Sequence, residues 1–256
     1  MIVMTKVIAV ANQKGGVGKT TTSINLSACV AHRGKKVLLI DLDPQGNAST
    51  GLGIDKRTTK YSIYDVLIND EPIKNVVINT PQENLYICPA SMNLAGAEIE
   101  LVSLISRESR LKSALEEVEG YYDYVFIDCP PSLGLLTLNA LTAAHTVLVP
   151  IQCEYFALEG LSQLMDTVRL VQKHLNKSLL VEGVVLTMFD PRTNLSVEVA
   201  EEVRKHFTNK VYQTLIPRNV RLSEAPSYGL PIIMYDSSSK GAIAYLSLAD
   251  ELITTT

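Results

Sequence analysis

The chain has 256 residues, 46% of them hydrophobic and 20% charged, so it is long and apolar enough to bury a sizeable core. Its formal charge of −4 at pH 7 excludes a protein coated in positive charge, and any contact with nucleic acid must use a local patch. Its four cysteines lie far apart with no CxxC pair, which argues against a disulfide framework, a metal cage or an iron–sulfur cluster.

The sequence also lacks the patterns of export and membrane insertion. Residues 1–10 are too short and too soon interrupted for a secretory signal, and no apolar run approaches the roughly 18 residues that span a bilayer. We therefore expect a cytoplasmic protein. No composition shift or repeat divides the chain, so a single domain over residues 1–256 is the expected organisation.

Short apolar, β-rich runs recur along the chain with helical stretches between them. The predicted strands are, in order, residues 7–11, 37–40, 85–88, 124–127, 146–149 and 184–188. Runs that are apolar on both faces are typical of a buried parallel sheet. Residues 21–32, ending at Gly34, and residues 158–175 predict helices, and the serines at 237–239 predict the start of the last helix.

This alternation predicts an α/β fold: a doubly wound, mostly parallel sheet with helices on both faces. Ligands of such sheets bind at the carboxyl ends of the strands. The residues that carry function should therefore directly follow strands.

The strongest motif is Lys14-Gly15-Gly16-Val17-Gly18-Lys19-Thr20, which follows the first predicted strand and opens a helix. It is a P-loop, and it predicts that the whole chain is one P-loop ATPase domain of the P-loop NTPase fold. Its glycines allow consecutive backbone N–H groups to surround phosphate oxygens, and the helix N-terminus adds partial positive charge. We expect Lys19 to contact the β- and γ-phosphates and the Thr20 hydroxyl to bind magnesium. Thr21 completes this part of the predicted nucleotide site.

The motif departs from the usual GxxxxGK[ST] pattern, because Gln13 stands where glycine is expected and Lys14 is an additional lysine. Lys19 already contacts the bound phosphates. Lys14 is therefore predicted to point outward, toward a nucleotide held by a second subunit. The alternative is an ordinary solvated loop lysine.

Carboxylates follow two further predicted strands. Asp41 and Asp43 come after residues 37–40, and Asp128 comes after residues 124–127, which places all three at the edge where the P-loop lies. Asp128 fits the Walker B role of holding magnesium through water. Strand alternation points Asp41 and Asp43 the same way, so we assign Asp41 to magnesium and Asp43 to orienting the attacking water.

Together, the motifs at residues 14–20, 41–45 and 128–131 resemble the deviant Walker A, A-prime and Walker B motifs of the ParA/MinD ATPases. The later segments EYFALEG (154–160), TMFDPRT (187–193) and IPRNVRLSEAP (216–226) look like those of the chromosomal ParA proteins called Soj. The resemblance covers nearly the whole chain. It implies an ATP hydrolase that uses Mg²⁺, is slow by itself, and is stimulated by a partner.

The resemblance further implies an ATP-dependent homodimer in which the nucleotides lie at the interface and Lys14 contacts the partner's phosphates. In such proteins the ATP dimer binds double-stranded DNA without sequence preference on the nucleoid. A ParB-type centromere-binding protein then stimulates hydrolysis and releases the dimer. Arg192 and Arg221 match positions that contact DNA in the Soj-like members, and Lys240 is a further candidate; the alternative is that they are ordinary surface residues.

The segment Pro217-Arg218-Asn219 resembles the loop that packs on the adenine, with Asn219 as a candidate partner for the base edge. The P-loop itself does not distinguish adenine from guanine. The sequence has no Asn-Lys-x-Asp run of the kind expected from guanine-specific GTPases. We therefore expect ATP as the nucleotide.

Two rival functions share this scaffold. A MinD-like positioning ATPase binds membrane through a basic amphipathic helix, but residues 245–256 carry acids where lysines are expected, so we expect no membrane contact. A synthetase that phosphorylates a small carboxylate needs a shaped pocket beside the γ-phosphate, and no constellation in the sequence demands one. Fold alone does not decide between these functions.

Overall fold

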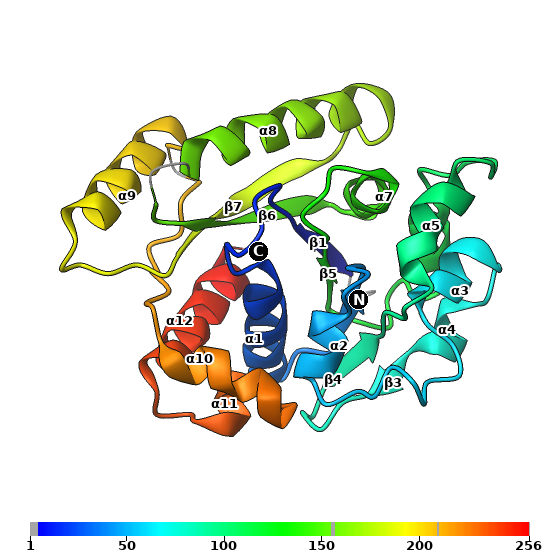
Figure 1. The fold of residues 1–256 in the computed structure, drawn as a ribbon, viewed down its shortest axis with the longest axis horizontal. Helices are drawn as coiled ribbons and strands as arrows, with labels where there is room; N and C mark the ends of the chain where they lie inside the picture. The colour runs from blue at the N-terminus through cyan, green and yellow to red at the C-terminus, as the bar shows by residue number, and fades with distance from the viewer. Residues whose placement is uncertain (1–4, 155–156, 209, 256) are drawn as a thin grey trace.

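The computed structural model describes residues 5–154, 157–208 and 210–255 (Figure 1); Tyr155 and Phe156 of the EYFALEG segment lie outside the described residues. Seven strands form one sheet in the order β3–β4–β2–β5–β1–β6–β7. They are β1 (Lys6–Val10), β2 (Val37–Asp41), β3 (Ile78–Asn79), β4 (Leu85–Cys88), β5 (Tyr124–Asp128), β6 (Thr146–Gln152) and β7 (Leu180–Thr187). All neighbours are parallel except β3 and β4. The predicted α/β sheet is confirmed.

The bounds of some strands differ from the prediction. β4 forms as predicted, but β7 begins at Leu180 rather than Val184, because its first residues pair with the start of β6. β3 was not predicted at all. It has only two residues, too few for an apolar period to be visible in sequence.

Successive residues of the central strands belong to two different hydrophobic layers. In β1, Ala9 lies in one layer, while Ile8 and Val10 lie in the other. β2 alternates in the same way, with Leu38 in the first layer and Leu39 in the second. Because neighbouring side chains of a strand point to opposite faces, a continuously apolar run buries both faces of the sheet.

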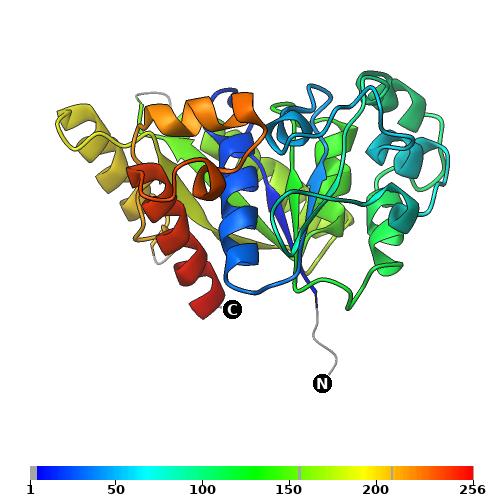
Figure 2. The ribbon, with the colours of Figure 1, turned by 90° about the horizontal axis from the view of Figure 1, so that it is seen from below.

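Helices cover both faces (Figures 1 and 2). One face carries α1 (Lys19–His32), α2 (Asn47–Gly51), α10 (Val220–Glu224), η1 (Ala225–Tyr228), α11 (Ile232–Tyr235) and α12 (Lys240–Thr254). The other carries α3 (Ile63–Ile68), α4 (Ile73–Val76), α5 (Leu94–Leu101), α6 (Arg110–Glu116), α7 (Leu135–Ala143), α8 (Ala157–His174) and α9 (Asn194–His206).

The predicted helix ends are present. Gly34, in the left-handed region at φ 80°, follows α1 and donates its N–H to the Ala31 carbonyl. The Ser239 hydroxyl accepts the Ala242 N–H and begins α12, as the serine cluster predicted. These two helices pack side by side on one face of the sheet.

Strand order brings the three motifs together. β5 lies between β1 and β2, so that Val10 and Asp41 are both in register with Asp128. The P-loop, the A-prime loop and the Walker B loop therefore leave the sheet at one edge.

Candidate nucleotide-binding site

The P-loop connects β1 to α1 and depends on glycine at two positions. Gly16 and Gly18 have φ of 75° and 87°, a left-handed conformation that favours glycine. Asn12 holds the start of the loop, because its Oδ1 accepts the Lys14 N–H and its Nδ2 donates to the Pro150 carbonyl. The loop is thus tied to the end of β6.

Lys19 lies inside this loop, with only 7% of its surface exposed. Its Nζ donates to the Lys14 carbonyl at 2.9 Å. Burial lowers the pKa of Lys19, while the nearby Asp128 opposes that shift. A buried ammonium held on a loop carbonyl at a helix N-terminus is placed to transfer to a phosphate oxygen.

The three predicted carboxylates converge beside the P-loop. Asp41 and Asp128 are fully buried, and Asp43 is 8% exposed. Burial raises the pKa of Asp41 to about 6, against the effect of hydrogen bonds from Ser49. Burial also raises the pKa of Asp128, the neighbouring Asp41 raises it further, and the hydroxyls of Ser23 and Thr20 oppose the shift.

The donor set fits a magnesium ion. Asp128 Oδ1 accepts the Ser23 hydroxyl at 2.8 Å, whereas its buried Oδ2 has no hydrogen-bond partner within the described part of the chain. A buried, unpartnered carboxylate oxygen near the Thr20 hydroxyl is suited to a cation or its water shell. Among the described side chains, no three His, Cys, Asp or Glu form a metal cage by themselves. Magnesium in such a site depends on phosphate oxygens and water.

Asp41 and Asp43 occupy different surroundings. Asp41 Oδ2 accepts both the backbone N–H and the hydroxyl of Ser49, at 2.7 and 2.6 Å. Ser49 Oγ in turn accepts the Ala90 N–H, which links β2, α2 and the end of β4. Asp43 Oδ1 accepts the Gln45 N–H at 2.9 Å. Ser23 and Ser49 were not predicted as site residues, because a serine within the first turns of a helix has no pattern in the sequence that marks its partner.

Lys14 is placed differently from the other residues of the loop. Its side chain is one-third exposed, and its Nζ lies 3.7 Å from Glu154 Oε2. Glu154 also accepts a hydrogen bond from Gln152 at the end of β6. The lysine predicted to act across a subunit interface is therefore paired within its own chain in this structure.

The segment predicted to pack on adenine lines a pocket of about 360 Å³, which Gly18 and Thr21 of the P-loop region also line. Pro217, Arg218 and Asn219 all contribute to its wall. Asn219 Oδ1 already accepts the Arg221 N–H, because Asn219 begins α10. Its Nδ2 can donate to a base, and its Oδ1 has a second lone pair that can still accept.

Two further residues of this pocket, Thr187 and Met188, were not predicted. Thr187 Oγ1 donates to the Val17 carbonyl of the P-loop at 2.8 Å. Met188 has φ 51°, which is unusual for a residue with a side chain. Their proximity depends on β7, which is far from the P-loop in sequence.

The three basic candidates lie close to this pocket or at the start of α12. Phe189 N–H donates to the Ile216 carbonyl, so the segments carrying Arg192 and Arg221 run side by side. Arg192 forms an ion pair with Asp190, at 2.7 Å between Nη2 and Oδ2. Arg221 Nη1 lies 2.8 Å from Glu224 Oε2, and its Nε lies 3.6 Å from Asp236 Oδ2; exposed Lys240 is the first residue of α12.

Known proteins resemble this chain over nearly its whole length. A family model described as an AAA domain matches residues 5–181. The sporulation initiation inhibitor protein Soj of Bacillus subtilis is 64% identical over 249 residues, covering 97% of this chain and 98% of that protein. The chromosome partitioning protein ParA of Myxococcus xanthus is 54% identical over 248 residues, covering 97% and 88%.

Solved structures agree with the fold. Cobyrinic acid a,c-diamide synthase from Mycobacterium smegmatis with bound ADP and magnesium has a TM-score of 0.86 and 42% identity, covering 98% of this chain and 94% of that one. The same protein with an ATP analogue and magnesium also has a TM-score of 0.86. In the described part of this chain, no helix is long and apolar enough to cross a membrane.

Proposed function

Because this chain belongs to the ParA/MinD family of P-loop ATPases, we propose that it is a chromosome- or plasmid-partitioning ATPase that Mg-ATP switches into a DNA-binding dimer. A ParB-type centromere-binding partner then stimulates hydrolysis, and hydrolysis releases the dimer from the nucleoid. The observation that carries the proposal is the buried Lys19 beside the unpartnered oxygen of Asp128, at the edge where the P-loop leaves the sheet.

Its cofactors are ATP and magnesium, which similar structures contain. Bound magnesium neutralises charge on the β- and γ-phosphates. Lys19 would contact the same phosphates, and the Thr20 hydroxyl, Asp128 and Asp41 would hold the ion, with the Asp41 side chain kept in place by Ser49. Pro217 and Asn219 hold the adenine in the adjoining pocket.

Asp43 is the residue we assign to the attacking water. It lies on the A-prime loop, close enough to Lys19 and Asp128 to act on their charges, and it is still 8% exposed. Its second oxygen is left to accept a proton or a hydrogen bond from water, since Oδ1 holds the Gln45 N–H. Orientation of water by a carboxylate of this kind speeds hydrolysis without a covalent intermediate.

Lys14 links nucleotide binding to dimerisation. In the isolated chain its ammonium pairs with Glu154, and in the dimer it contacts the phosphates held by the partner subunit. Phosphate carries more charge than a single exposed carboxylate, so the exchange of partners is favourable once two nucleotides face each other. Dimerisation then doubles the basic patch of Arg192, Arg221 and Lys240 for contact with DNA phosphates.

The membrane alternative is disfavoured by the packing of α12. Tyr245, Leu248 and Leu252 on its apolar face are buried in the core against α1. On the same helix, Asp250 pairs with Arg33, and Glu251 accepts two backbone N–H groups. An apolar face that is already buried is not free to enter a bilayer.

The test is binding of the purified protein to an arbitrary DNA duplex without nucleotide, with ADP, and with a non-hydrolysable ATP analogue, at two salt concentrations. We expect binding only with the analogue, in the dimeric form, and weaker binding at the higher salt. Absence of binding in every state would reject the partitioning function and favour a synthetase, the kind of activity named for the similar M. smegmatis protein.

A further inference from the structure

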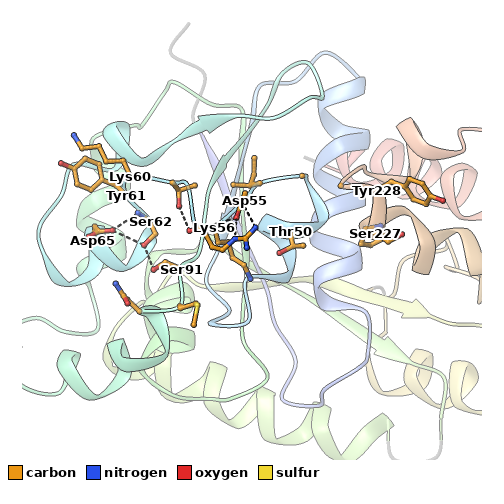
Figure 3. A pocket seen from close by; sticks show the side chains of 18 residues that line it. Thr50, Asp55, Lys56, Lys60, Tyr61, Ser62, Asp65, Ser91, Ser227 and Tyr228 are labelled. Carbon is orange, nitrogen blue, oxygen red and sulfur yellow. Dashed lines mark hydrogen bonds and ion pairs between the residues drawn. The ribbon is translucent and has the colours of Figure 1, made fainter.

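A second groove, which shares Pro226 with the wall of the nucleotide pocket, lies between the loop after α2 and the turn formed by η1 (Figure 3). Its volume is about 850 Å³. The walls come from residues 53–62, from residues 91–93 after β4, and from residues 226–229. Figure 2 places the light-blue loop and the orange α10–η1 segment along the same upper edge of the molecule.

Two glycines bring the walls together. Gly53 and Gly229 both have left-handed φ, of 77° and 67°. A Cβ atom added to Gly229 would lie 2.6 Å from the Gly53 Cα, so the two backbones are in direct contact. The loop after α2 is thereby fixed against η1, which directly follows the α10 helix that carries Arg221.

The groove is basic although the chain as a whole is acidic. Lys60 lies with its Nζ 4.7 Å from the centre of the Tyr61 ring, and it forms no ion pair within the described residues. The Lys56 ammonium donates to the Gln45 carbonyl rather than to a carboxylate. Arg57 pairs with Asp55, so its charge is balanced locally.

The groove contains a second carboxylate, that of Asp65. Asp65 accepts the Ser62 N–H and hydroxyl at the start of α3, and it also accepts the Asn69 amide. The lining therefore carries three cationic side chains, those of Lys56, Arg57 and Lys60, against the two carboxylates of Asp55 and Asp65, and Lys60 forms no ion pair among the described residues. Arg192 and Arg221, by contrast, are each paired with an acid of their own segment.

We propose that this groove is a second binding surface for the phosphate backbone of double-stranded DNA, continuing the patch of Arg192 and Arg221 across the Gly53–Gly229 contact. The inference rests on the proposed DNA-binding function and extends it to Lys60; Arg57 adds its charge only when Asp55 no longer pairs with it. A lysine that neutralises a DNA phosphate releases the counterion condensed on that phosphate, and the ring of Tyr61 lies against the Lys60 ammonium. A polyanion that spans both sides of the contact meets more positive side chains than either side offers alone.

The test compares Lys60→Gln with Lys36→Gln. Lys36 is also exposed and also lies over tyrosine rings, those of Tyr86 and Tyr122, but it precedes β2 at the opposite edge of the sheet. Affinity for a DNA duplex is measured with the non-hydrolysable ATP analogue over a salt series, and dimerisation is checked separately. Lys56 is left unchanged, because its stem packs on Gly46 and its ammonium holds the A-prime loop.

We expect Lys60→Gln to dimerise normally, to bind DNA severalfold more weakly, and to lower the slope of log K against log salt by about 0.9 for each phosphate that is no longer neutralised. Asp55→Asn, which frees Arg57, should strengthen binding, and Lys36→Gln should leave slope and affinity as in the wild type. An unchanged slope in Lys60→Gln overturns this inference alone, whereas a wild-type protein that binds no DNA overturns the partitioning function as well.

Discussion

At the scale of single residues, Lys19 shows how the fold prepares a charge for a ligand. The ammonium is buried and holds only the Lys14 carbonyl, so burial lowers its pKa and a phosphate would restore a strong partner. We expect Lys19→Ala to weaken ATP binding by about 10- to 100-fold, the range of one charged hydrogen bond in a buried site. Calorimetric titration with an ATP analogue checks this, and unchanged affinity would remove Lys19 from the phosphate site.

A second prediction, about the strength of the ATP-dependent dimer, follows from the ion pair between Lys14 and Glu154. Lys14→Ala should keep ATP binding and lose the ATP-dependent dimer. Glu154→Gln should tighten the dimer, by at most about fivefold for each protomer, because an exposed ion pair is worth about 0–1 kcal/mol. Sedimentation with an ATP analogue measures both.

The control for that experiment is Glu116→Gln, which makes the same change of net charge beside the start of β1, away from the P-loop. Normal dimers in Lys14→Ala would return Lys14 to the status of a solvated loop lysine. Weaker dimers in Glu154→Gln would show instead that Glu154 contacts the partner.

For Asp43 the expected effect is on turnover alone. Asp43→Ala should bind ATP and dimerise but fail to hydrolyse it, which gives a long-lived dimer. Asp43→Asn keeps an oxygen for the Gln45 N–H and removes the charge, so it separates the shape of the loop from its chemistry. Phosphate release measures turnover; wild-type rates in both variants would assign the water to another residue.

At the scale of elements, His145 joins three strands at the edge opposite the nucleotide site. Its Nδ1 accepts the Val7 N–H at 3.0 Å, and its own backbone bonds to Val7 and Leu180. An imidazole that accepts a hydrogen bond at Nδ1 carries no proton on that atom, so the whole ring is uncharged. Burial favours this uncharged form and lowers the pKa of His145 below its ordinary value of 6.5. A lowered folded-state pKa means that the unfolded chain takes up a proton first as the pH falls.

Stability linked to His145 is therefore full above about pH 6.5 and declines as the pH falls toward the lowered folded-state pKa. His145→Gln, which does not titrate, should show a smaller loss of denaturation midpoint between pH 7.0 and 5.5 than the wild type. His32→Gln at the exposed end of α1 is the control. Equal losses in the wild type and His145→Gln would mean that other groups cause the acid sensitivity.

At the scale of the whole molecule, the proposed function requires an acidic chain to bind DNA through a few basic residues, whose number a dimer would double. Arg192→Ala should weaken DNA binding of the ATP-analogue dimer and reduce its salt slope by about 0.9 for each phosphate left without its arginine, with ATPase unchanged. Asp190→Asn should have the opposite effect on affinity, since Asp190 holds the guanidinium in this structure. Gel-shift titrations over a salt series measure both effects.

Arg169→Ala on α8 is the matched control, because Arg169 is an exposed arginine paired with Asp166 on the same helix. Its removal changes net charge as Arg192→Ala does. If both variants altered the slope equally, net charge rather than a local patch would govern binding.

Most of the sheet, the helices that connect its strands and the three motifs at its edge could be predicted from the sequence, but β3 and the first residues of β7 could not. Continuous apolar runs and a glycine-rich loop are local signals, and β1, β2, β4 and β5 follow from them with small changes in their bounds. Asp41, Asp43 and Asp128 were predicted to meet because parallel strands share a carboxyl edge, and the register of Asp41 with Asp128 confirms that expectation.

The hydrogen-bond and ion-pair partners of the site residues could be known only from the tertiary structure. The partners of Asp41, Lys14 and the P-loop carbonyl of Val17 are Ser49, Glu154 and Thr187, of which the last two lie more than one hundred residues away. The spacing of apolar residues along the sequence does not indicate such contacts, because they depend on strand order and on backbone packing like that of Gly53 against Gly229. The same holds for the groove: its charged residues can be read from the sequence, but the fold places them beside α10, which carries Arg221.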